Sequence, residues 1–250
     1  MAEVALLEVR GVCKAFGGVQ AVAGVCFRLR GGDVQAVIGP NGAGKSTLFN
    51  LLTGQLRCDA GQILFRGERI DGTPPHQIWR KGISRTFQVP AAFQSLTVRE
   101  NVQTALLSRQ GRSRNLASRA APLCEDAASA LLAQVGLLAD ADEACGTLSL
   151  GDVKRLELAL ALAGEPALLL LDEPAAGMSV DERADLMGAV LRIVRERNLT
   201  VLFTEHDMDV VFGAATRILV LHQGRVLAEG SPAAVRENAE VQRVYLGGAP

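Results

Sequence analysis

The sequence contains no long apolar run and no surplus of charge. Its most apolar stretch, residues 156–171, is interrupted by Glu157, Glu165 and Pro166, so it is too short and too broken to span a bilayer. The first residues show no basic segment followed by an apolar core, so no signal peptide is visible. Lys and Arg number 26 against 27 Asp and Glu, a net charge of -1, and no basic excess indicates a nucleic-acid partner. We therefore expect a chain that is soluble by itself.

The cysteines lack the spacing of a metal site. They are odd in number and scattered: Cys13, Cys26, Cys58, Cys124 and Cys145. This pattern favours reduced thiols in a cytosol over disulfides or a metal centre. A chain of 250 residues can bury a full core, as one large α/β domain or as one domain with an inserted lobe.

A glycine-rich stretch fits the phosphate-binding loop pattern, in which a glycine and four further residues precede Gly-Lys-Ser. The stretch consists of Gly39, Pro40, Asn41, Gly42, Ala43, Gly44, Lys45, Ser46 and Thr47. Residues 34–38 before it predict a short buried strand, and residues 45–52 after it predict a helix stopped by Gly54. Such a loop points its N–H groups at a polyphosphate, aided by the positive end of the helix. We expect Lys45 to reach the β- and γ-phosphates and the Ser46 hydroxyl to bind Mg²⁺.

Two apolar strands end in polar residues that suit phosphate chemistry. Residues 167–171 form an apolar run ending in Asp172 and Glu173, and a fully apolar strand belongs inside a parallel sheet. Because α/β folds place ligands at the carboxyl ends of strands, Asp172 is predicted to hold Mg²⁺, directly or through water. Glu173 could accept a proton from an attacking water, and His206, after the predicted strand 200–204, could contact that water or the γ-phosphate. The alternatives are an acidic turn and a structural histidine.

Alternation of apolar and polar residues predicts further strands, and capping residues predict further helices. Strands are expected at residues 6–12 as an edge strand, and at 25–30, 61–67, 83–87, 217–222 and 225–229. Capping boxes predict helices from Thr97 to about Arg109 and from Ser179 to about Arg197. Other helices are expected from Thr73-Pro74 to Gly82, over 122–135, from Ser149 to about 163, from Ser231, and over 241–246. Residues 90–163 show no convincing strand, so we expect a helical lobe inserted into a sheet protein. The basic stretch 110–119 is expected to be a solvated linker.

Residue chemistry alone leaves two possible roles for each of three positions. Phe16 could pack in the core or stack on an adenine ring. Gln88, at the end of a predicted strand, could be a surface residue or could orient water or touch Mg²⁺. Ser149 to Asp152 could form a further capping box, or could bind an anion at a helix N-terminus.

Taken together, these positions resemble the ATP-binding cassette (ABC) ATPases over nearly the whole chain. Residues 39–47 look like Walker A, Gln88 like the Q-loop glutamine and residues 148–152 like the signature motif. Residues 168–173 look like Walker B with Glu173 as its catalytic glutamate, residues 175–179 like the D-loop, and His206 like the switch histidine. Phe16 stands where the family has its adenine-stacking aromatic. The resemblance departs at Leu150 and Asp152, where the family usually has Gly and Gln, and at Ser179, where many members have Asp.

The resemblance implies a fold and its division. The fold is an α/β P-loop NTPase with a RecA-like core sheet, an N-terminal antiparallel β subdomain and an inserted α-helical subdomain. Residues 1–89 and 164–250 would form the nucleotide-binding core, and residues 90–163 the helical subdomain. The segments 85–88, 172–177, 204–208 and 244–247 are similar to those of the ATPase subunits of branched-chain amino-acid importers, with cassettes for urea or other amides as near relatives.

The resemblance also implies a mechanism with partners. ATP would bind between two cassettes placed head to tail, with Phe16, the phosphate loop, Gln88, Asp172, Glu173 and His206 from one cassette. Ser149 and Gly151 would come from the other, and Ser46, Gln88 and Asp172 would hold Mg²⁺. Two integral membrane permease subunits would dock near residues 88–98, with a solute-binding protein acting indirectly and the chain lying on the cytoplasmic face of the membrane.

Two other functional classes of protein remain as alternatives to a transporter subunit. Soluble ABC proteins of ribosomes or DNA repair usually carry two cassettes or a long coiled coil, and this sequence shows neither an internal repeat nor heptads. The altered signature motif is the clue that would favour a regulator that binds nucleotide without hydrolysing it.

Overall fold

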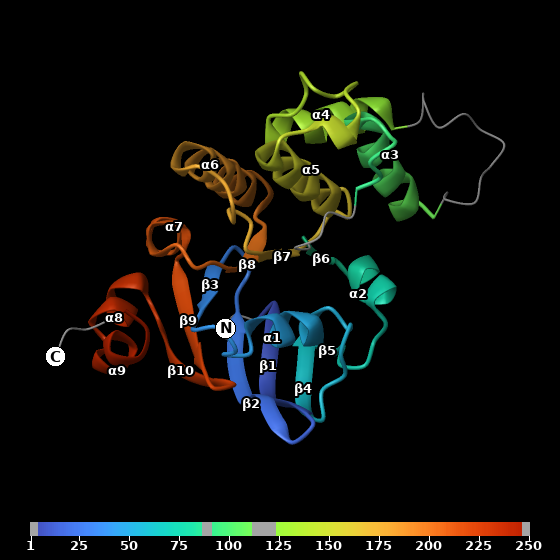
Figure 1. Ribbon diagram of the computed structural model, residues 1–250. Coiled ribbons are helices and arrows are strands. Elements are labelled where there is room, and N and C mark those ends of the chain that lie inside the picture. The colour runs from blue at the N-terminus through green and yellow to red at the C-terminus, as the bar shows by residue number, and fades with distance from the viewer. Residues whose placement is uncertain (1–4, 87–91, 112–123, 247–250) are drawn as a thin grey trace.

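The computed structural model describes residues 5–86, 92–111 and 124–246, which form two sheets with flanking helices (Figure 1). The strands are β1 (Leu7–Phe16), β2 (Val19–Leu29), β3 (Val34–Ile38), β4 (Ala60–Phe65), β5 (Glu68–Arg69), β6 (Ile83–Arg85), β7 (Leu168–Asp172), β8 (Thr200–Thr204), β9 (Arg217–His222) and β10 (Arg225–Gly230). The α-helices are α1 (Lys45–Leu52), α2 (Pro75–Lys81), α3 (Val98–Arg109), α4 (Glu125–Val135), α5 (Leu150–Leu162), α6 (Val180–Arg197), α7 (Met208–Ala214), α8 (Pro232–Glu237) and α9 (Ala239–Val241). A 3₁₀ turn (Cys145–Thr147) and a π-helical turn (Gln242–Leu246) complete the described elements.

The larger sheet has six strands in the order β10-β9-β3-β8-β7-β6. Its five strands from β9 to β6 are parallel, and β10 joins β9 as an antiparallel hairpin. Every residue of β3, β7 and β8 is buried, as expected for apolar strands with parallel neighbours on both sides. Because these strands run in one direction, their carboxyl ends meet at one edge, which carries the phosphate loop, Asp172 and His206.

The smaller sheet is antiparallel, with the order β2-β1-β4-β5. The prediction that its first strand is an edge strand is wrong, because β1 lies between β2 and β4. Both β1 and β2 are also longer than predicted. Gly11 and Gly24 take φ angles of 57° and 71° where the register shifts, and these bulges interrupt the alternation on which the prediction relied.

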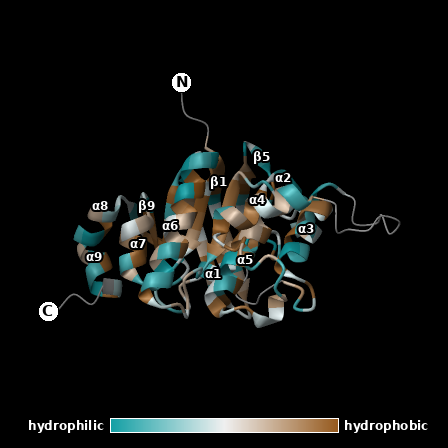
Figure 2. Cartoon of the chain, turned by 90° about the horizontal axis from the view of Figure 1, so that it is seen from above, coloured by the Kyte–Doolittle hydropathy of each residue, from teal (hydrophilic) through white to brown (hydrophobic). Residues whose placement is uncertain are grey.

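Two apolar clusters hold these layers together. Helix α1 packs between the two sheets, where Leu48 and Phe49 lie in one cluster with residues of β1, β2, β3, β7 and β8. The second cluster joins the other face of the six-stranded sheet to α3, α4, α5, α6 and α7. Figure 2 shows the resulting pattern, with apolar residues concentrated on the strands and polar residues on the outer faces of the helices.

Helices α3, α4 and α5 gather as a separate group above one end of the six-stranded sheet (Figure 1). The capping box that begins α3 is confirmed: Thr97 Oγ1 accepts the Glu100 N–H at 3.1 Å, and the Glu100 carboxylate accepts the Thr97 N–H at 2.8 Å. An isolated bridge between Thr97 and Ala144 is the β pairing observed in the described part of this region. The division into a core and a subdomain of residues 90–163 stays a prediction.

Two helix boundaries differ from the prediction. Helix α2 is capped by Pro74 and begins at Pro75, so the expected cap at Thr73 is wrong. A residue before proline is kept extended, and Pro74 accordingly has φ −62° and ψ 148°. At the C-terminus, the expected helix over 241–246 is a π-helical turn that continues from α9. None of the helices in the described ranges is long and apolar enough to cross a membrane.

Candidate functional site

The phosphate loop links β3 to α1 and depends on glycine at two close approaches. A Cβ on Gly39 would lie 2.1 Å from the Leu221 carbonyl oxygen, and one on Gly44 would lie 2.2 Å from that of Ala21. Both glycines also have positive φ, 151° and 102°, which other residues rarely adopt. The neighbouring strands therefore fix the curvature that turns the N–H groups of the loop inward.

Lys45 is buried under this loop. Its Nζ donates to the carbonyl oxygens of Gly39 at 2.6 Å and Pro40 at 3.2 Å. Burial lowers the pKa of Lys45, and the nearby charges of Glu173 and Asp172 oppose that shift. Ser46, one residue further along α1, is exposed, so its hydroxyl is accessible at the start of the helix.

Asp172 ends β7 and is held on both of its carboxylate oxygens. Its Oδ1 accepts the Thr204 hydroxyl at 2.8 Å, and its Oδ2 accepts Arg85 at 2.7 Å. The side chains of Arg85 and Asp172 are 7% and 4% exposed, so this ion pair is removed from water. Arg85 also donates to Asn50 Oδ1 of α1 at 2.6 Å, which ties β6, β7 and α1 together. The site predicted from sequence included neither Arg85 nor Thr204. For Arg85, the available signal was a charged residue inside a predicted strand.

Glu173 and His206 face each other across the tips of β7 and β8. The Glu173 Oε1 atom lies 3.0 Å from His206 Nε2, and both side chains are partly exposed. Glu173 has a φ of 48°, and its N–H donates to the carbonyl and the hydroxyl of Thr204, each at 3.1 Å. This turn directs the carboxylate away from the strand and toward the histidine, so the two residues named from sequence form one constellation.

Glu205 is a buried carboxylate beside this pair. Its Oε1 accepts the Ala175 N–H at 2.8 Å, and its Oε2 accepts the N–H of His206 at 3.2 Å. Burial raises the pKa of Glu205, while these two N–H groups stabilise its ionised form. It joins the tip of β8 to the segment that follows Glu173. Sequence reasoning gave it no role, and its position after an apolar strand was the available signal.

Two further residues were predicted to belong to the site, Phe16 and Gln88, and the structure describes only the first. Phe16 ends β1 with 47% of its surface exposed, so the core-packing alternative is wrong and part of the side chain is accessible. The Lys14 ammonium lies 5.6 Å from the centre of that ring. Gln88 lies outside the described residues.

The N-terminus of α5 is capped locally. Ser149 Oγ accepts the Asp152 N–H at 3.2 Å and donates to the Asp152 carboxylate at 2.6 Å. The Asp152 carboxylate thus binds the hydroxyl of Ser149, whereas a full capping box would use the Ser149 N–H. Gly151 is buried beside α6, where a Cβ would lie 3.1 Å from Glu182 Oε1. Ser179 caps α6 in a complete box with Glu182.

A groove of about 520 Å³ lies between α2, β6, α3 and α5. It is lined by Thr53, Gln55, Pro75, His76, Ile78, Trp79, Ser84, Arg85, Thr86, Phe93, Asn101, Thr104, Ala105, Ser108, Glu157, Leu160 and Ala161. We call it the α2–α3 groove. Within the described chain, the buried atoms Ser84 Oγ and Glu157 Oε1 have no hydrogen-bond partner. Burial raises the pKa of Glu157, and Lys154 at 3.4 Å from its other oxygen partly offsets this shift.

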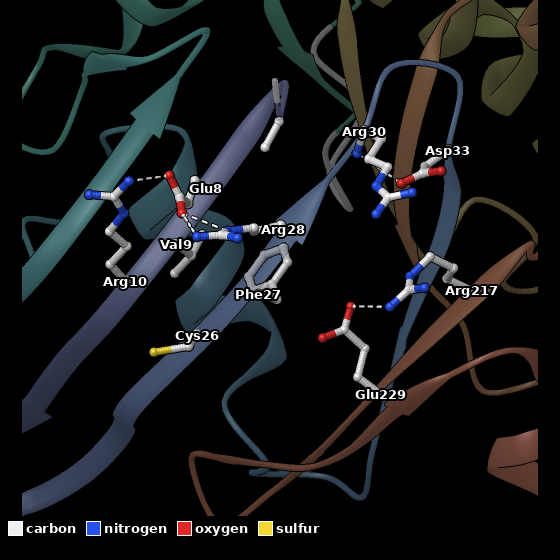
Figure 3. A pocket seen from close by; sticks show the side chains of 11 residues that line it. Glu8, Val9, Arg10, Cys26, Phe27, Arg28, Arg30, Asp33, Arg217 and Glu229 are labelled. Atoms are coloured by element: carbon white, nitrogen blue, oxygen red, sulfur yellow. Dashed lines mark hydrogen bonds and ion pairs between the residues drawn. The ribbon is translucent and has the colours of Figure 1, made fainter. Parts of the chain in front are cut away.

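A pocket of about 550 Å³ on the antiparallel sheet has a different character (Figure 3). Its charged side chains pair with one another: Glu8 contacts Arg10 and Arg28, each at 2.5 Å, and Arg217 contacts Glu229 at 3.0 Å. None of the predicted site residues lines it. We interpret it as a salt-bridged surface and assign the candidate site to the strand tips.

Comparisons with known proteins agree with this geometry. A sequence model of the family described as "ABC transporter" matches residues 22–176, and one described as "Branched-chain amino acid ATP-binding cassette transporter" matches residues 225–250. The chain is 40% identical to the high-affinity branched-chain amino acid transport ATP-binding protein LivG of Escherichia coli K12, covering 97% of this chain and 98% of LivG. It is 41% identical to BraF of Pseudomonas aeruginosa, which has the same description, with the same coverage.

Solved structures give the same assignment. A nucleotide-free ATP-binding cassette from an ABC transporter is 30% identical, with a TM-score of 0.86 over 98% of this chain and 100% of the other. An ATP-binding cassette in its ADP conformation is also 30% identical, with a TM-score of 0.85 over 98% and 99%. This chain belongs to the ABC transporter family. It is an ATP-binding subunit, an ABC ATPase that hydrolyses ATP to energise transport.

Proposed function

We propose that this chain powers the import of branched-chain amino acids. The support for this solute is the match of residues 225–250 to the branched-chain family, together with the similarity over nearly the whole chain to LivG and BraF. The observation that carries the catalytic part is the Glu173–His206 pair at 3.0 Å, at the strand edge that also carries Lys45 and Asp172.

In this proposal the nucleotide lies on the phosphate loop. Phe16 stacks on the adenine, residues 39–47 surround the phosphates, and Lys45 moves from the loop carbonyls to the β- and γ-phosphates. Mg²⁺ would be held by Ser46, Gln88 and Asp172 and would neutralise phosphate charge. Because Thr204 and Arg85 already occupy both Asp172 oxygens, we assign Asp172 to a water of the metal shell, a coordination that Mg²⁺ favours.

Glu173 is the group that takes the proton of the attacking water. His206 holds one of its carboxylate oxygens, and Thr204 fixes its backbone, so the second oxygen can face the water without reorganisation. A second cassette, placed head to tail, supplies Ser149 and Gly151 to the same phosphates. For that contact the Ser149 hydroxyl turns from Asp152 to the nucleotide, at the cost of one hydrogen bond.

The α2–α3 groove is the proposed binding site for the membrane partners. Phe93, which lies within the predicted docking segment, lines the groove, and the other walls come from both the sheet and the helical group. A helix inserted there would therefore be displaced by any relative movement of the two. The unpartnered Ser84 Oγ and Glu157 Oε1 would gain hydrogen-bond donors from that helix. The chain then lies on the cytoplasmic face of the membrane, bound to two permease subunits, with a solute-binding protein acting on the opposite side.

Ala105→Arg should prevent assembly with the membrane subunits. Ala105 lies in the groove wall on α3, and an arginine there fills space that the proposed helix needs. We expect at least a tenfold loss of co-purifying permease, with ATP binding by the isolated subunit unchanged. Affinity purification from membranes measures the first, and fluorescent-nucleotide titration measures the second. Ala130→Arg, on the exposed side of α4, is the matched control, and equal recovery of permease by both variants would reject the groove.

Solute uptake by the reconstituted complex tests the transport assignment. Vesicles containing this chain, its co-purified permeases and binding protein should take up leucine, isoleucine or valine when ATP is supplied on the side of this chain. Uptake of urea or short amides with none of these amino acids would reject the solute and keep the ATPase assignment.

A further inference from the structure

Glu173 has a backbone conformation that neighbouring contacts must hold. Its φ of 48° lies in the left-handed region, which a residue with a side chain adopts at a cost and keeps only where the surrounding structure fixes it. On its N-terminal side, the N–H of Glu173 donates to the carbonyl and hydroxyl oxygens of Thr204, each at 3.1 Å. The pairing of β7 with β8 ends with Asp172 opposite Thr204, so a different contact must hold the chain after Glu173.

The Glu205 carboxylate supplies a contact on that side. Its Oε1 accepts the N–H of Ala175, two residues after Glu173, at 2.8 Å, and its Oε2 accepts the N–H of His206 at 3.2 Å. Ala175 and Glu205 are only 2% and 4% exposed, so water has little access to the bond between them. One side chain therefore joins the segment that follows Glu173 to the residue that Glu173 faces, beyond the last paired residues of the two strands.

This bridge needs an acceptor at both of its ends. A carboxylate provides two acceptor oxygens, whereas an amide of the same shape provides one oxygen and one NH₂ group that itself donates. Burying an ionised group costs free energy unless the group is hydrogen-bonded. The two N–H partners of Glu205 therefore explain a carboxylate here better than packing does.

We propose that Glu205 is a positioning residue for ATP hydrolysis: its carboxylate fixes the chain on the C-terminal side of Glu173 and thereby keeps the Glu173 carboxylate 3.0 Å from His206. Without the bond to Ala175, Glu173 is free to relax toward an ordinary φ, and its carboxylate leaves the direction that the attacking water requires. The inference rests on the proposed role of Glu173 as base, and it assigns a function to a buried group that acts through that base.

Glu205→Gln should lower kcat of the transporter-bound protein by about 10- to 100-fold, because a catalytic group displaced by about 1 Å loses activity on this scale. The glutamine keeps the shape of the side chain but turns a donor toward one of the two N–H groups. ATP binding should stay within about twofold, since the phosphate loop lies between β3 and α1. Phosphate release at saturating ATP measures kcat, and fluorescent-nucleotide titration measures binding.

Asp71→Asn is the matched control. The Asp71 side chain is 8% exposed, and its Oδ1 accepts the N–H of Ile63 at 3.1 Å in the antiparallel sheet. The same change of carboxylate to amide is thus made at a main-chain contact away from the strand tips, and turnover should stay normal. Equal losses of turnover in the two variants, or turnover by Glu205→Gln within about twofold of the unaltered protein, would overturn the inference.

Combining Glu205→Gln with Glu173→Gln separates the inference from the proposed function. If Glu205 acts through Glu173, the double variant hydrolyses ATP no more slowly than Glu173→Gln alone. A further tenfold loss in the double variant would show that Glu205 acts elsewhere and would overturn the inference. Normal hydrolysis by Glu173→Gln alone would instead overturn the role of Glu173 as base, on which the inference depends.

Amide hydrogen exchange in the unaltered protein tests the bridge should Glu205→Gln fold poorly. The N–H groups of Ala175 and His206 should both exchange slowly although they lie beyond the paired residues of β7 and β8. Exchange at the rate of an unprotected amide at either position would overturn the inference.

Discussion

Glu173→Gln should leave ATP binding intact and reduce hydrolysis by about 10²- to 10⁴-fold, the usual contribution of a general base. The amide keeps the size of the carboxylate and one oxygen that can face His206 Nε2, so the geometry at the tips of β7 and β8 is preserved. It cannot take the proton of the attacking water. The variant should therefore accumulate with ATP bound and, in the proposed mechanism, with two cassettes closed over it.

Phosphate release by the transporter-bound variant measures the first effect, and nucleotide titration measures the second. Glu196→Gln, which makes the same chemical change on the exposed face of α6, should retain normal turnover. Hydrolysis by Glu173→Gln within about threefold of the unaltered protein would remove Glu173 from the role of base. General-base catalysis cannot contribute so little when its group is lost.

Arg85→Met should lower the free energy of unfolding by about 3–5 kcal/mol, because it leaves the buried Asp172 carboxylate without its cation. Methionine fills much of the space of the arginine stem, so packing loss is the smaller part. The guanidinium also bonds Asn50 of α1 and lies 5.5 Å from the centre of the Phe49 ring. Its loss should therefore also loosen the contact between β7 and helix α1, which follows the phosphate loop.

Urea unfolding followed by circular dichroism measures this effect. Arg10→Met breaks a surface pair with Glu8 and should leave the free energy of unfolding nearly unchanged, as is usual for surface ion pairs. Combining Arg85→Met with Asp172→Leu removes both charges and should recover part of the loss. If Arg85→Met and Arg10→Met were equally stable, the buried pair would not be the link that we describe.

The elements nearest the nucleotide could be predicted because their signals are local. Three strands, β3, β7 and β8, are fully buried and read as apolar runs, and the polar residues that end them must meet at one edge of a parallel sheet. The glycines of the phosphate loop and the serine and threonine caps act within a few residues of themselves. Lys45, Asp172, Glu173 and His206 could therefore be proposed as site residues from sequence, and the structure brings Glu173 and His206 within 3.0 Å of each other.

The supporting contacts could not be predicted, because each joins positions far apart in the chain. Arg85 reaches Asp172 from another strand, and the Glu205 carboxylate accepts the N–H of Ala175 from the neighbouring strand end. No periodicity relates such pairs. The error on β1 has a related cause, since the bulges at Gly11 and Gly24 depend on pairing between strands and erase the two-residue pattern.

The most direct test of the catalytic account is a crystal structure of Glu173→Gln with Mg²⁺ and ATP. We predict a triphosphate along residues 39–47, Lys45 Nζ on its β- and γ-phosphates, residue 173 facing a water in line with the γ-phosphate, and Ser149 of a second copy on the opposite side. A nucleotide bound elsewhere, or a γ-phosphate distant from residue 173, would contradict it.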